Sequence, residues 1–311
     1  MTASISVLQR AILAKRETTP YVYSGPVASD SLSTFTSMTL EIDPMRIDKN
    51  NLARRTFGIS KPEFDPEGSF LNLKIDVPGY KTASPGAKPV ISEFLWACGL
   101  KETVTAGVSV KYEPQTPPDV NAAQTTSFMV HQSGEGHKLA GARGAFSLSG
   151  SPKDGIVFKF DLSSPWMLVP QTIAIPVASP PPATKRLVFA SGAVVMQDGS
   201  VIDIGQFDFS PGNKVEKDVS SGGGTIFITD TKPTLKINPY SVAGDGEFLR
   251  LLNSEAVAFQ ASFNNGAMVL DIPVAVRVKT GKKERAGRFS DEIEFECIET
   301  NGDDAFSLLF T

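Results

Sequence analysis

Two adjacent stretches decide the fold class: residues 137–148 read HKLAGARGAFSL and residues 155–162 read GIVFKFDL. In the second stretch Ile156, Phe158 and Phe160 alternate with other residues, which is the period-2 pattern of a strand with one buried face. Glycine and proline punctuate the interval between the two stretches and indicate a turn. The pair therefore predicts two adjacent β-strands.

The same alternation recurs along the chain, and only two segments depart from it. One is VISEFLWAC at residues 90–98, between Pro89 and Gly99, and the other is EFLRLL at residues 247–252, after Gly246. We expect a short amphipathic helix in each. The alternating stretches are FLNLKIDV (70–77), TIFIT (225–229), VAVRVK (274–279) and EIEFECI (292–298), so the sequence predicts a mainly β protein.

The order of these segments is similar in the two halves of the chain. The first half runs through residues 37–48, a loop, residues 55–64, a strand, a helix and the pair 137–148 and 155–162. The second runs through residues 199–210, a Gly-rich loop, residues 225–237, a helix and the pair 268–279 and 291–298. The order predicts two tandem β-sandwich or barrel domains, each with a short flanking α-helix. The alternative is chance, because alternating strands resemble one another in any all-β protein.

The densest proline cluster lies between the halves, in SSPWMLVPQTIAIPVASPPPA at residues 163–183. Such a run stays extended, because proline fixes φ and lacks an amide donor. We therefore expect a first domain with an N-terminal arm at residues 1–165, a Pro-rich connection at 166–190 and a second domain at 191–311.

Composition argues against several classes of partner. The 311 residues are 41% hydrophobic and carry a formal net charge of −4, so a large core is available and no basic field attracts nucleic acid or a membrane surface. No stretch approaches the ~18 apolar residues of a membrane span. Cys98 and Cys297 have no cysteine or histidine close by, and we expect both to be buried and reduced.

Enzyme motifs are missing from the sequence, and we expect no catalytic site, cofactor or metal. The only histidines, His131 and His137, lie six residues apart in a Gly-rich stretch. A carbohydrate-binding or glycan-degrading β-sandwich is one alternative, although Trp96 and Trp166 supply few stacking surfaces. A catalytic carboxylate pair from distant strands also stays open.

Seven short stretches, taken together and in order, resemble the major tail tube protein family of long-tailed bacteriophages. The resemblance covers nearly the whole chain and implies a β-sandwich or barrel whose sheets join edge to edge with neighbours, six domains surrounding the lumen. The stretches are LAKRETT (13–19), LWACGL (95–100), VSVKYEP (108–114), GHKLAGARGAFSL (136–148), FDFSPGN (207–213), ITDTKPTLKINP (228–239) and DEIEFEC (291–297).

With two such domains per chain, the resemblance implies trimeric rings of pseudo-sixfold symmetry that stack into a DNA-conducting tube. It places the protein in the virion after assembly in the bacterial cytoplasm, with a tail terminator, distal tail or tip proteins and a tape measure protein as partners. Genomic DNA would pass without specific binding. A tail terminator or a baseplate hub domain is the structural alternative, and the tail type stays open.

Two charged clusters are candidate assembly features. Glu292, Glu294 and Glu296 share one face of a strand, where they would line the lumen and repel DNA or lie on a solvated outer face. A basic cluster occupies KTGKKERAGR, which we expect to be a loop between two strands. Such a loop is a solvated hairpin tip or, in a tube, a contact with the adjacent ring, and inter-ring contact is favoured over DNA binding. The members of the cluster are Lys279, Lys282, Lys283, Arg285 and Arg288.

Two long polar segments, residues 42–55 and 205–224, occupy matching places in the two halves. Both exceed the ~2–5 residues of a usual hairpin loop. They predict arms that reach another subunit, or else mobile surface loops.

Overall fold

The computed structural model describes residues 10–32, 34–47, 62–116, 124–132, 134–151, 153–165, 171–172, 185–189, 194–220, 223–242, 244 and 246–311. The fold is 63% strand and 6% helix, which confirms the prediction of a mainly β protein. No helix within these ranges is long and apolar enough to cross a membrane.

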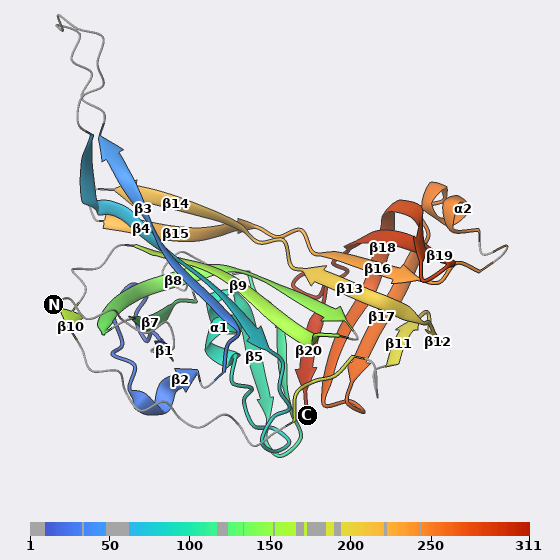
Figure 1. The fold of residues 1–311 in the computed structure, drawn as a ribbon, viewed down its shortest axis with the longest axis horizontal. Helices are drawn as coiled ribbons and strands as arrows, with labels where there is room; N and C mark the ends of the chain where they lie inside the picture. The colour runs from blue at the N-terminus through green and yellow to red at the C-terminus, as the bar shows by residue number, and fades with distance from the viewer. Residues whose placement is uncertain are drawn as a thin grey trace, which may run out of the picture.

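The described residues of the first half form ten strands and two short helices (Figure 1). They are β1 (Arg10–Arg16), η1 (Ala28–Asp30), β2 (Ser31–Leu32), β3 (Ser37–Ile47), β4 (Glu63–Pro78), α1 (Ser92–Ala97), β5 (Leu100–Thr105), β6 (Ser109–Pro114), β7 (Thr126–Gln132), β8 (Glu135–Ser151), β9 (Gly155–Pro165) and β10 (Gln171–Thr172).

In the second half, the residues that the structure describes form ten further strands and one helix, and the predicted bounds of this helix are confirmed. They are β11 (Val194–Gln197), β12 (Ser200–Val201), β13 (Ile204–Ser210), β14 (Lys214–Ser220), β15 (Gly223–Asp230), β16 (Thr234–Pro239), α2 (Glu247–Leu252), β17 (Ala256–Phe263), β18 (Met268–Arg285), β19 (Arg288–Cys297) and β20 (Ser307–Phe310).

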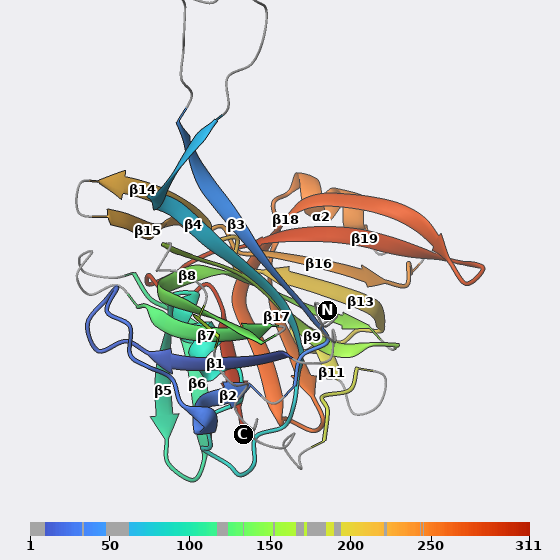
Figure 2. The same cartoon turned by 60° about the vertical axis from the view of Figure 1, so that its left-hand side comes forward.

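One antiparallel sheet passes through both halves in the order β3-β4-β9-β8-β13-β16-β19-β18. Strands β8 and β13 connect the halves, with Leu148 opposite Phe209 and Gly150 opposite Phe207. Apart from β14 and β15, which lie over the first half, Figures 1 and 2 show the strands of the two halves on either side of this junction. Backbone pairing therefore crosses from one half to the other.

Strands β8 and β18 are long enough to belong to two layers. The first part of β8 pairs with β7 and its last part with β9, while β18 pairs in the same way with β17 and β19. A register shift interrupts both ladders at the same place, between Thr126 and Phe128 in β7 and between Val257 and Phe259 in β17. The two layers enclose the core.

The two halves use the same order of ladders: β1-β7-β8-β9-β4-β3 in the first and β11-β17-β18-β19-β16-β13 in the second. LKID at residues 73–76 and LKIN at residues 235–238 occupy matching positions, with Leu73 opposite Leu162 and Leu235 opposite Phe295. When the two halves were compared by sequence, residues 55–64 were matched with residues 225–237, so this correspondence was missed. Residues 55–61 lie outside the described residues.

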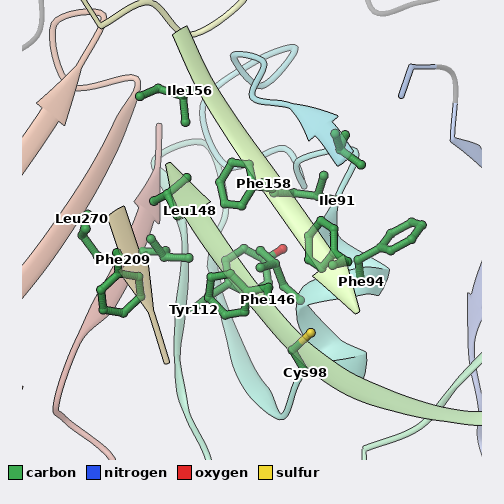
Figure 3. Close-up of a cluster of buried hydrophobic side chains, with 14 of the residues drawn as sticks. Ile91, Phe94, Cys98, Tyr112, Phe146, Leu148, Ile156, Phe158, Phe209 and Leu270 are labelled. Carbon is green, nitrogen blue, oxygen red and sulfur yellow. The ribbon is translucent and has the colours of Figure 1, made fainter. Parts of the chain in front are cut away.

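The buried side chains form one cluster that extends through both halves. Figure 3 shows Phe146 and Leu148 of β8 beside Phe209 of β13 and Leu270 of β18. The centroid of the Phe209 ring lies 6.4 Å from that of Phe146 and 4.8 Å from that of Phe306. Of the predicted connection at 166–190, only residues 171–172 and 185–189 are described, and Leu187 is fully buried.

Candidate assembly interface

The joint between β8 and β13 is the candidate template for assembly. Phe207 and Phe209 point into the core, while Asp208 and the opposing Ser149 occupy the other face. Gly150 makes the close approach possible, because a Cβ there would lie 2.2 Å from Cε1 of Phe207. The joint thus combines backbone pairing with aromatic burial.

Two strand edges correspond to the two sides of this joint. Strand β3 holds the position in the first half that β13 holds in the second, and among the described residues it pairs only with β4. Strand β18 corresponds to β8, and its segment 279–285 pairs only with β19 within the described part of the chain. An edge of this kind can pair with another chain.

The predicted acidic strand has one charged and one buried face, as the alternation indicated. Ile293, Phe295 and Cys297 are at most 5% exposed. On the other face the three carboxylates pair with lysines: Glu292 with Lys283 at 3.1 Å, Glu294 with Lys236 at 3.3 Å and Glu296 with Lys232 at 2.7 Å. This face is mixed in charge rather than purely acidic.

The basic cluster does not lie in a loop, so that interpretation was wrong. Lys279, Lys282, Lys283 and Arg285 belong to β18, Arg288 begins β19, and only the two residues 286–287 form the turn. Both have positive φ, at 50° and 75°, as a tight hairpin turn requires.

Several of these basic side chains have partners within the same half. Lys282 lies 3.9 Å from Asp291, and Arg285 donates to the backbone and side-chain oxygens of Asn238. The guanidinium of Arg285 also stacks 3.9 Å from the ring centre of Tyr240. These contacts hold the end of the hairpin on its own sheet.

The segment 205–224 is not a long loop either, because it contains nearly all of β13, the whole of β14 and the beginning of β15. This hairpin packs on the first half of the same chain. Asn213 donates to the carbonyl oxygens of Cys98 and Gly144 at 2.8 and 3.0 Å. Lys217 pairs with Asp43 at 2.8 Å.

The remaining predicted candidates do not converge on a site. His137 lies opposite Val130 in the β7–β8 ladder, and no cluster of three metal-ligating side chains occurs among the described residues. Trp96 is covered by the guanidinium of Arg16 at 4.4 Å, and Trp166 lies outside the described residues. Cys98 and Cys297 are buried and unpaired as predicted, and burial raises the pKa of both thiols.

A partly buried charged cluster that the sequence did not reveal fixes α1. Arg16 of β1 contacts Glu93 of α1 at 2.9 Å and Glu102 of β5 at 2.6 Å. Burial alone would raise the pKa of Glu102, but hydrogen bonds from Arg16, Lys88, Ser92 and Tyr112 outweigh it and lower the pKa to about 2. The pKa of Glu93 is raised, chiefly by burial.

This cluster predicts an acid-dependent loss of stability. The folded-state pKa of Glu102 lies below its ordinary value of 4.5. The stabilisation of the fold by its ionised carboxylate is therefore complete above pH 4.5 and is lost as pH falls through about 2. Wild type should therefore be more stable than Glu102→Gln at pH 6, and the difference should shrink toward pH 2. Urea unfolding at a series of pH values measures it, and a constant difference would contradict this role.

The chain matches no protein-family model, and a search of curated proteins gives no significant match.

Proposed function

We propose that this protein is a major tail tube subunit of a long-tailed bacteriophage, built from two tandem tube-type domains. The β8–β13 joint carries the proposal, because it connects two halves of equal ladder order and leaves the corresponding edges, β3 and β18, at the two ends of one sheet. If β18 of one copy pairs with β3 of the next, each new joint repeats the internal one. The assignment to a phage tail rests on the sequence resemblance to tail tube proteins.

A head-to-tail joint that repeats between copies closes a ring when a full turn is a whole multiple of the rotation from one copy to the next. With two domains per chain, three copies give the six domains expected around a tube. Such rings would stack between the tail terminator and the distal tail or tip proteins, with a tape measure protein in the lumen. In this proposal the protein is a structural component of the virion and catalyses no reaction.

In this arrangement the face of β19 that carries Glu292, Glu294 and Glu296 lines the lumen. Its lysine partners cancel much of the local charge, so DNA would meet no concentrated basic surface. The basic end of the β18–β19 hairpin, including Arg288, remains our candidate for contact with the adjacent ring.

The internal joint predicts the register between copies. Thr39 of β3 corresponds to Asp208, and Lys283 of β18 corresponds to Ser149, which lies opposite Asp208. Thr39→Cys protein mixed with Lys283→Cys protein should therefore give a disulfide-linked dimer under mild oxidation.

The matched control is Thr39→Cys mixed with Lys279→Cys, because four residues along a strand displace the thiol by about 13 Å. Equal dimer yields in non-reducing gel electrophoresis from both mixtures would contradict the register.

Negative-stain electron microscopy tests the function itself. The purified protein should form rings of three copies, or tubes, with a central pore. Rings that never stack would favour a terminator or hub role. A protein that stays monomeric at every concentration tested would refute the proposal.

A further inference from the structure

The two helices occupy matching places in the halves but differ in burial. Both contain the sequence EFL, at residues 93–95 in α1 and 247–249 in α2. Phe94 and Leu95 of α1 are at most 1% exposed, whereas the matching Phe248 and Leu249 are 54% and 65% exposed. Leu252, at the end of α2, is 78% exposed. Helix α2 therefore presents an apolar face that α1 does not.

In the first half, the end of α1 lies against the base of the β14–β15 hairpin. Asn213, just before β14, donates to the carbonyl oxygen of Cys98, the residue that follows α1. A Cβ on Gly99 would lie 3.3 Å from Cδ1 of Ile228 in β15. This hairpin connects β13 to β16, so it belongs to the second half but covers the first.

The connection between β3 and β4 is the counterpart of that hairpin. We name its described residues, 42–47 of β3 and 63–69 of β4, the arm. The outer end of the arm projects away from the body of the molecule (Figures 1 and 2). The arm carries apolar side chains in solvent: Ile42 and Phe64 are each 54% exposed, Ile47 is 45% exposed and Met45 is 41% exposed.

We propose that the arm of one copy covers the apolar face of α2, formed by Phe248, Leu249 and Leu252, in the neighbouring copy. The β14–β15 hairpin follows β13 and covers the half of the chain whose β8 pairs with β13. By the same relation, the arm follows β3 and should cover the half of the neighbouring copy whose β18 pairs with β3. Figure 1 places the arm and α2 at opposite sides of one molecule, so an arm does not cover its own α2. The occupant is therefore a second copy.

The inference rests on the proposed ring, and its first test introduces charge on α2. Leu249→Lys/Leu252→Lys should leave the monomer folded, because both side chains are exposed there. Burying two lysines under the arm should lower the fraction assembled into rings by about tenfold or more. Val201→Lys, at a side chain 71% exposed on β12, is the matched control and should assemble like wild type.

The second test is proximity. Ile42→Cys protein mixed with Leu252→Cys protein should give a crosslinked dimer on oxidation, whereas Ile42→Cys mixed with Val201→Cys should not. Each partner carries one new cysteine, so the new disulfide forms between copies. Wild-type rings together with full assembly of the double lysine variant and no crosslink would overturn the arm contact and leave the ring intact. A wild type that never forms rings would overturn both proposals.

Discussion

Phe209→Ala is expected to lower the free energy of unfolding by about 3–5 kcal/mol, the range for truncating a fully buried phenylalanine. The ring is 0% exposed and contacts the rings of Phe146 and Phe306, which come from different parts of the chain. Truncation removes these contacts at the β8–β13 joint and leaves a cavity there. Urea denaturation followed by circular dichroism measures the change.

Phe289→Ala is the matched control, because its side chain is 67% exposed and its loss should change the free energy by less than about 0.5 kcal/mol. A single unfolding transition that shifts as a whole in Phe209→Ala would agree with the continuous core. If the second half unfolded alone while the first kept its stability, the joint would not couple the halves.

The sequence located individual elements well where a local signal marked their ends. Gly246 precedes α2 with a φ of 68°, and Pro89 and Gly99 flank α1, so both helices were placed to within two residues. Alternation likewise identified the buried face of β9 and of β19. Such signals are contained within a few residues.

Local signals of this kind do not predict which distant segments of the chain pair with each other. Alternation shows which face of β13 is buried, but not that Phe209 lies opposite Leu148. The polar strand β14 was interpreted as a loop, because nearly all its side chains are exposed and, within the described part of the chain, it forms a ladder only with β15. The lysine partners of Glu294 and Glu296 in β19 were also missed, since Lys232 and Lys236 lie about sixty residues earlier in the chain.

The helices also show how one local motif acquires two environments. In α1, Glu93 pairs with Arg16 of β1, and Phe94 and Leu95 are buried. In α2, the matching Glu247 pairs with Arg277 of β18, and Leu249 and Leu252 are exposed. The EFL sequence predicts the helix in both cases, but the burial of its apolar face depends on what the rest of the chain, or another copy, supplies.

Glu247→Ala is the second substitution with a large expected effect. The Arg277 side chain is 0% exposed, and its Nε lies 2.8 Å from Glu247 Oε2. Removing the carboxylate leaves a buried charge without its counterion, which typically costs about 3–5 kcal/mol. Glu255→Ala is the control, because that carboxylate is 46% exposed and lies 3.7 Å from Arg250, so its loss should cost no more than about 1 kcal/mol.

The double variant Glu247→Ala/Arg277→Leu identifies the cause. If the uncompensated charge accounts for the loss, removing the arginine as well should restore most of the stability in urea unfolding. An unchanged or larger deficit would mean that the packing of the two side chains matters more than their charges. Glu247→Ala should also weaken ring formation by releasing α2 from β18, whereas charging Leu249 and Leu252 should affect assembly alone. Comparing the two variants therefore separates the anchoring of α2 from its contact with the arm.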